Sequence, residues 1–460
     1  MIEWLETKFN PIMIKEIYQG FRGRWFVIGY GLTLLISLGG YMTIVLPASP
    51  YNETLGAGLF MLLFFSMMLV ALLIIPVSAG NQLRNEIISN TLDLIAITNL
   101  SPWAIIIGRF QAAGLKILLL FAYMGPFAIA AFLLGGIGIT GILYSLGFLL
   151  LFSLGFCAFI LMVNALPALS QRYKNLAATI QTLLVLFLIF PIVVTPFGRI
   201  SFGAISWRWG TTEMLLSLYL LGVVSLFIIF FLRMAADMLT PPAIRTFMYA
   251  KLILMCLLMV MCLPFFKGVL FSSRSLGVEV TITIFLVALF TLYFFALFWG
   301  GQLGTAHRSI LHRLLGNGYT PTLVYVIVLT FGMSLLAAAT SNRYSENLLL
   351  VGLYCVTYYT FFSGLARMLR RFLKPDKRTA VVYLVLLLAL IIFNGMLTLI
   401  YSAMMGGYAA AYTSSVILAF MPFVYFGSLS LFRHVGGEML LPFIVGLFAA
   451  WLGREETAEP

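Results

Sequence analysis

Long apolar runs separated by short polar segments make up almost the whole chain. Each run is close to the ~20 residues that an α-helix needs to cross the hydrocarbon core of a bilayer. The pattern therefore predicts about 12 transmembrane helices joined by short loops. The runs cover about residues 25–46, 57–79, 116–135, 141–165, 175–197, 212–232, 251–267, 281–300, 321–340, 348–366, 380–403 and 412–432.

A further apolar stretch, 439–452, is short for a span. A thirteenth crossing and a re-entrant or interfacial helix both fit its length, so its assignment stays open.

The composition supports a membrane-embedded chain. Of its 460 residues, 62% are hydrophobic and only 9% are charged, and the mean hydropathy is +1.07. Soluble domains are about a quarter charged. The predicted fold class is an all-α polytopic membrane protein of the cell inner (cytoplasmic) membrane. No segment is long enough for a separate soluble catalytic domain.

The basic residues predict the orientation of the chain in the membrane. Segments that the layout places inside hold 21 of the 27 Lys and Arg residues, and Lys116 lies at a boundary. Cytoplasmic loops of membrane proteins carry such an excess, which predicts a cytoplasmic N-terminus. The net charge of +12 is thereby explained without nucleic acid, and membrane lipids are the expected anionic partner. The segments predicted outside hold only Arg199, Arg208, Lys267, Arg274 and Arg343.

The N-terminal segment predicts an amphipathic helix before the first span. Asn10 is a suitable N-cap, and Pro11 suits the first helical position because its missing N–H costs nothing there. Lys15 and Glu16 fall on faces other than the apolar one. We expect this helix to lie in the membrane interface. The apolar positions at helical spacing are Ile14, Ile17, Tyr18, Phe21 and Trp25.

Residues 80–110 form the longest comparatively polar segment in the first half. Asp93 suits the first turn of a short helix, where the helix dipole favours an acidic residue. Ser101 can cap a second helix whose first position is Pro102. That second helix would extend about 20 Å before the next apolar run begins. A rigid docking element fits this pattern, and so does an ordinary well-capped loop.

Several kinds of chemistry are absent from the sequence. No G-x-x-x-x-G-K-[ST] phosphate loop occurs, so the chain does not hydrolyse nucleotide by that route. The predicted spans hold almost no ionisable side chains, which argues against an ion-driven carrier. We therefore expect no enzyme activity, bound cofactor or metal site in this chain. A twelve-span secondary carrier and an integral membrane enzyme or scaffold acting on lipids are the alternatives.

Several irregularly spaced motifs occur over about residues 8–136. They are Asn10-Pro11 with Lys15-Glu16, Glu86, Thr91-Leu92-Asp93-Leu94, Thr98, Leu100-Ser101-Pro102-Trp103, Gly108-Arg109 and Gly135-Gly136. Together they resemble the permeases of ATP-binding-cassette (ABC) type-2 exporters. Two departures from the family pattern are Asn99, where Pro is frequent, and Arg109, where Lys is frequent.

The resemblance implies a permease subunit worked by a separate cytosolic ABC ATPase, which would bind ATP and Mg. The cargo would be exported and is unknown, with a lipid-like, hydrophobic or peptide molecule expected from the apolar spans. The connecting helix would carry Asn10, Pro11, Lys15 and Glu16. The ATPase-coupling interface would comprise Glu86, Thr91, Leu92, Asp93, Thr98, Ser101, Pro102 and Trp103.

A short internal match suggests two six-span halves. Gly80-Asn81-Gln82-Leu83 precedes Ser101-Pro102, and Gly300-Gly301-Gln302-Leu303 precedes Thr320-Pro321 at nearly the same separation. The predicted organisation is a 6+6 repeat. Whether the two halves form one pore, or a homodimer or a second permease completes it, stays open. The predicted domains are a connecting helix (1–24), a first permease domain (25–240) with a coupling element (80–110), and a diverged second membrane domain with a short C-terminal tail (241–460).

Overall fold

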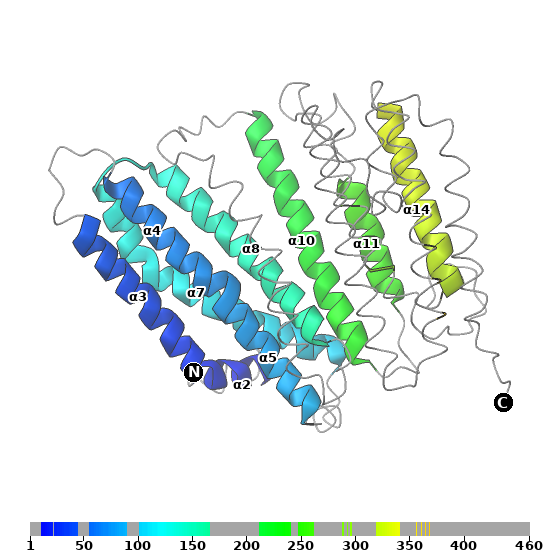
Figure 1. Ribbon diagram of the computed structural model, residues 1–460, viewed down its shortest axis with the longest axis horizontal. Coiled ribbons are helices and arrows are strands. Elements are labelled where there is room, and N and C mark those ends of the chain that lie inside the picture. The colour runs from blue at the N-terminus through cyan, green and yellow to red at the C-terminus, as the bar shows by residue number, and fades with distance from the viewer. Residues whose placement is uncertain are drawn as a thin grey trace, which may run out of the picture. The chain divides into compact units, whose positions relative to one another are not determined.

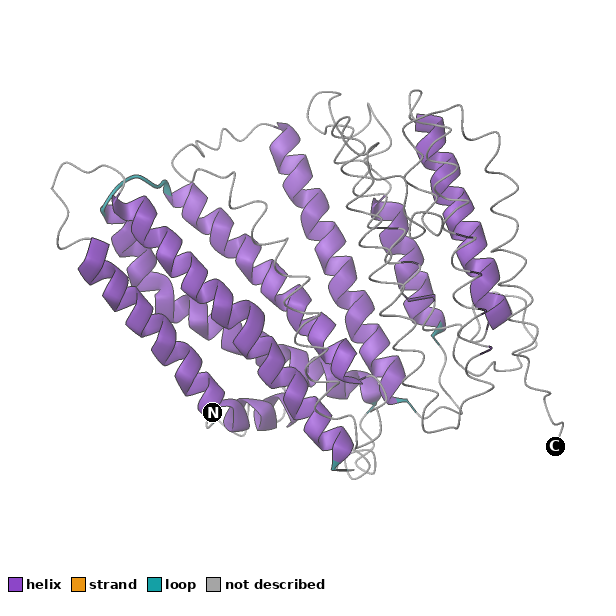
Figure 2. Cartoon of the chain, viewed as in Figure 1, coloured by secondary structure: helices purple, strands orange, loops and turns teal. Residues whose placement is uncertain are grey.

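The structure is a computed structural model in which every described element is a helix (Figure 2). It describes residues 11–21, 23–44, 55–89, 101–165, 211–240, 247–261 and 319–340, with single positions at 288, 292, 295–296, 356, 360, 364 and 368. The residues from 90 to 100, the middle of the predicted coupling element (80–110), lie outside the described part of the chain.

The chain divides into two compact units, 1–245 and 246–460. That each of them is a six-span permease domain stays a prediction. The helices described in the second unit are α11 (Met248–Met261) and α14 (Tyr319–Thr340). Those of the first unit are α2 (Pro11–Phe21), α3 (Arg24–Ile44), α4 (Leu55–Leu69), the π-helix η1 (Val70–Ile74), α5 (Ile75–Ile88), α7 (Pro102–Leu133), α8 (Ile139–Ala165) and α10 (Thr211–Leu239).

Four helices among the described residues are long and apolar enough to cross a membrane: Leu55–Ile87, Pro102–Leu133, Ile139–Ala165 and Leu218–Leu239. The chain is therefore a helical membrane protein. Several of its helix bounds lie close to the predicted runs, as α8 does to the run 141–165. The full count of 12 spans and the 6+6 repeat involve residues outside the described ranges.

The long helix that begins at Leu55 contains one π-helical turn, η1, which separates α4 from α5. The Ile75 N–H donates a hydrogen bond to the Val70 carbonyl, five residues back. Pro76 follows directly and has no N–H to donate to the carbonyl four residues before it. The wider turn is a means of passing the proline without ending the helix. Leu55 to Ile88 thus runs as one rod with a local irregularity near its middle.

Two clusters of buried side chains hold the first unit together. Lipid tails are as apolar as Leu, so close packing rather than escape from water stabilises such contacts. The first cluster joins α4, α7 and α8 through Leu59, Phe60, Leu63, Phe64, Met67, Met124, Ala131, Ile142 and Leu149. The second joins η1, α5, α7 and α8 through Val70, Ala71, Ile75, Ala79, Ala113, Ile117, Leu120 and Cys157.

Helix α2 lies crosswise at the lower end of α3 and packs on α7 (Figure 1). Its buried positions are Ile12, Glu16 and Gly20, which recur every four residues and so share one face. Tyr18, expected on the apolar face, is 58% exposed. The sequence placed Glu16 on a different face from the apolar one. In the structure Glu16 faces the protein, where the cations Arg109 and Lys116 of α7 lie near it.

Helix α7 begins where the sequence predicted a second helix. The Ser101 hydroxyl accepts a hydrogen bond from the Ala104 N–H at 3.2 Å, and Pro102 is the first helical residue. The helix continues without interruption to Leu133. Its first half does not stand free, because Ile105, Ile106, Arg109, Ala112 and Ala113 are all buried.

Replacing Ser101 with Ala should destabilise the protein by about 1 kcal/mol, because the first turn of α7 loses the side-chain acceptor that satisfies the Ala104 N–H. Thermal unfolding of the purified protein in detergent would measure this. Ser101→Thr keeps an acceptor and should retain most of the stability. Ser89→Ala is the control, since the exposed Ser89 hydroxyl donates to the Asn85 and Glu86 carbonyls of its own helix, whereas the Ser101 hydroxyl accepts from a first-turn N–H. Equal losses for Ser101→Ala and Ser89→Ala would contradict the cap.

Candidate functional site

A cluster of charged side chains lies where α2, α5 and α7 meet. Lys15 and Glu16 come from α2, Glu86 comes from the last turn of α5, and Arg109 and Lys116 come from α7. Glu86 stands just before residues 90–100, and Arg109 stands just after them in the chain. The cluster therefore connects the N-terminal helix to both flanks of the predicted coupling element.

Glu86 is the centre of the ion pairs. Lys15 Nζ lies 2.8 Å from Glu86 Oε1, and Arg109 Nη2 contacts Glu86 Oε2 directly. The same Arg109 nitrogen lies 3.5 Å from Glu16 Oε1. One guanidinium thus faces two carboxylates on two different helices.

Most of this cluster is withdrawn from solvent. The side chains of Arg109 and Glu16 are 2% and 4% exposed, that of Glu86 is 17% exposed, and that of Lys15 is 43% exposed. Burial raises the pKa of Glu16 above its ordinary value of 4.5, while the nearby Arg109 guanidinium opposes this by favouring the charged form. The other charges that act on Glu16 are Glu86, Lys116 and Lys15.

Lys116 is 4% exposed and reaches from α7 to α2. A methyl group on Gly20 would collide with the Lys116 side chain at Cε and Nζ, so glycine leaves the space that the lysine occupies. The hydroxyl of Tyr30 on α3 donates a hydrogen bond to the Lys116 carbonyl. Lys116 therefore belongs to the contact between α2 and α7.

A second polar contact joins the start of α7 to the end of α10. The Arg233 guanidinium lies 5.9 Å from the centre of the Trp103 ring, within the range of a cation–π interaction. Arg233 Nε also lies 3.2 Å from Asp237 Oδ1, one helical turn further along α10. Trp103, a residue of the coupling element predicted from sequence, is thereby held against α10.

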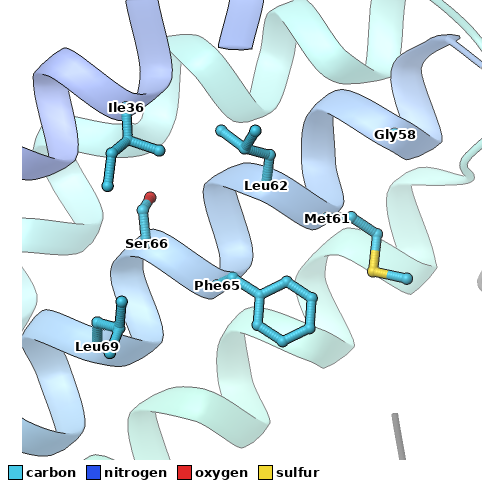
Figure 3. Close-up of a pocket in the computed structure, with 7 residues that line it drawn as sticks. All are labelled: Ile36, Gly58, Met61, Leu62, Phe65, Ser66 and Leu69. Atoms are coloured by element: carbon cyan, nitrogen blue, oxygen red, sulfur yellow. The ribbon is translucent and has the colours of Figure 1, made fainter. Parts of the chain in front are cut away.

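A shallow apolar groove lies between α3 and α4 (Figure 3). Its volume is about 390 Å³. The single hydroxyl among its lining side chains, that of Ser66, donates to the Leu63 carbonyl of its own helix. Hydrocarbon is the chemistry that this surface fits. The lining residues are Ile36, Gly58, Met61, Leu62, Phe65, Ser66 and Leu69.

The structure brings together residues that the sequence assigned to two separate segments. Lys15 and Glu16 of the connecting helix meet Glu86 of the coupling interface, whereas Trp103 and Pro102 lie apart from this cluster at the start of α7. Arg109 and Lys116 were not identified as site residues from the sequence. Arg109 and Lys116 are about two helical turns apart and so lie on one side of α7, and this spacing was the available signal. The predicted residues Asn10, Thr91, Leu92, Asp93 and Thr98 lie outside the described ranges.

These features define the class of the chain as a helical membrane protein with a charged helix junction at one end of its first unit. Comparisons with protein-family models, with curated proteins and with solved structures find no match.

Proposed function

We propose that this chain is the transmembrane permease subunit of an ATP-driven ABC exporter. A separate cytosolic ATPase would dock on the segment around residues 84–103, and its closure on ATP would move that segment and the attached spans. The chain would itself hold no nucleotide site. The proposal keeps the N-terminus in the cytoplasm and the chain in the inner membrane.

The observation that carries the proposal is the buried contact of Glu86 with Arg109, together with the Lys15–Glu86 pair. A docking segment transmits force only if both of its ends are anchored to the spans. Glu86 and Arg109 flank residues 90–100 and form an ion pair with each other. The two helices that lead into and out of this segment are therefore linked to each other. The pair with Lys15 extends the connection to α2, the helix that the family resemblance names as the connecting helix.

The apolar groove supports a hydrophobic or lipid-like cargo. A lining of aliphatic and aromatic side chains fits an acyl chain and offers little to a charged solute. A peptide cargo with apolar side chains fits the same surface. The cargo class is thus part of the proposal, and the groove is the feature that favours it.

Purification of the full chain together with the cassette ATPase encoded beside it tests the proposal. We expect a stoichiometric complex whose ATP hydrolysis depends on the membrane subunit. Asp93→Ala and Trp103→Ala should weaken the complex or its ATP hydrolysis several-fold. Trp103→Phe is the matched control, because it keeps an aromatic face for Arg233.

Two results would reject the assignment in different ways. If no cassette ATPase associates with the unaltered chain, the exporter proposal fails. If a complex forms but neither replacement affects ATP hydrolysis, the docking segment lies elsewhere in the chain.

A further inference from the structure

The Arg109 guanidinium uses only part of its hydrogen-bonding capacity. Arginine carries five N–H donors. Nη2 faces both carboxylates, with Glu86 in direct contact and Glu16 Oε1 at 3.5 Å. Nε and Nη1 are buried and have no hydrogen-bond partner within the described part of the chain. Unused donors on a buried cation are costly, so such an arrangement calls for an explanation.

Glu16 shows the complementary deficiency. It is 3% exposed, and its Oε1 makes no hydrogen bond with any described residue despite the nearby guanidinium. The groups that face it are Arg109 and Lys116 from α7, Glu86 from α5 and Lys15 from its own helix. An acceptor without a donor therefore lies within a short movement of donors without an acceptor.

We infer that Arg109 exchanges carboxylate partners, with Glu86 holding it in the arrangement seen here and Glu16 taking it when the end of α5 moves away. The two carboxylates belong to different helices, so a shift of α5 relative to α2 changes which of them is closer. The Glu16 carboxylate can then accept hydrogen bonds from the unpaired nitrogens of the Arg109 guanidinium in a bidentate ion pair. The exchange rests on the ion pairs themselves. What moves α5 rests on the proposed function.

Partner exchange predicts that the two carboxylates substitute for each other. Loss of Glu86 would let Arg109 turn to Glu16, and loss of Glu16 would leave the Glu86 pair in place. Only the loss of both would strand a buried cation. A fixed Arg109–Glu86 pair with Glu16 as a bystander predicts instead that loss of Glu86 alone has the full effect.

A double-mutant cycle on the full chain in detergent separates these cases. The melting temperature is measured for the unaltered protein, Glu16→Gln, Glu86→Gln and the double variant. We expect a drop for the double variant that is clearly larger than the sum of the two single drops. Additive drops for the two carboxylates, or a Glu86→Gln drop as large as that of the double variant, overturn the inference.

The pH dependence of the melting temperature gives a second test, because a Glu16 that does not pair with Arg109 would not change it. In the Glu86→Gln background Glu16 is the remaining carboxylate, and it pairs with Arg109 only when ionised. Pairing with Arg109 in this background would lower the folded-state pKa of Glu16 below its ordinary value of 4.5, which reverses the increase that burial causes in the unaltered protein. The melting-temperature gap between Glu86→Gln and the double variant should therefore widen as pH rises toward that ordinary value. A gap that stays constant or narrows contradicts exchange.

These measurements need no ATPase, so they can fail while the exporter proposal stands, and the reverse also holds. If the double variant does not accumulate although both single variants do, that loss is itself the expected non-additive result. The pH test then compares Glu86→Gln with the unaltered protein, and Glu86→Gln should lose stability more steeply as pH falls. Equal pH slopes for these two proteins overturn the inference.

Discussion

Replacing Gly56 with Ala should destabilise the first unit by about 3 kcal/mol, at the upper end of the cost of overpacking a core. A methyl group at this position would fall on the backbone carbonyl oxygens of Ala131 and Gly135. Backbone cannot turn aside as a flexible side chain can, so α4 and the end of α7 would have to separate. We expect a melting temperature well below that of the unaltered protein and a reduced yield from membranes.

The matched control is Gly58→Ala on the same helix. A methyl group at Gly58 meets nothing within 4 Å. Alanine also has the better helix propensity, by up to about 1 kcal/mol, so this variant should be as stable as the unaltered protein or slightly more so. Similar melting temperatures for the two variants would show that α4 and α7 do not approach as closely as described.

The close approach depends on the turn that follows α7. Gly135 and Gly136 both have φ of 81°, a left-handed conformation that glycine adopts without the steric cost other residues incur. The chain can therefore reverse tightly between α7 and α8 while the Gly135 carbonyl lies against Gly56. Small residues at helix contacts serve this purpose in membrane proteins, where packing is the main attraction.

Removing the Arg109 side chain should produce the second large effect. Arg109→Met would leave the buried Glu16 and the partly buried Glu86 without their shared cation, and breaking such a pair costs about 3–5 kcal/mol. Thermal unfolding in detergent would measure the loss. Lys15→Met removes an ion pair of Glu86 with a side chain that is 43% exposed, and should cost about 1 kcal/mol or less.

A rescue experiment tests the cause of the Arg109 effect. Adding Glu16→Gln and Glu86→Gln to Arg109→Met removes the stranded charges and should recover part of the stability, because replacing all members of a buried ionic group is far milder than removing one. If Arg109→Met is no worse than Lys15→Met, the cluster does not stabilise the junction of α2, α5 and α7.

The sequence and the structure agree best on which residues form helices. The run predicted at 141–165 is α8 (Ile139–Ala165), and the cap predicted at Ser101 is present. Both results follow from local physics. A backbone inside a bilayer must satisfy its hydrogen bonds internally, so a long apolar run becomes a helix. A capping side chain bonds within its own first turn.

The sequence did not reveal contacts that depend on distant neighbours. Lys116 was placed at a span boundary, and its packing against Gly20 of α2 was not foreseen. Glu16 was placed away from the apolar face of the N-terminal helix, yet it is 3% exposed. The helical period shows which residues share a face, but it does not show which face meets the rest of the protein when that face carries a charge.

The sequence by itself determined that this chain is a polytopic helical membrane protein, where α7 begins, and which residues the permease resemblance rests on. Length, hydropathy and caps are local properties, and they suffice for those conclusions. Only the tertiary structure decided that Lys15, Glu16, Glu86 and Arg109 form one cluster. Lys15 and Glu86 are 71 positions apart in the chain, and the 2.8 Å between their charged atoms arises from the packing of three helices.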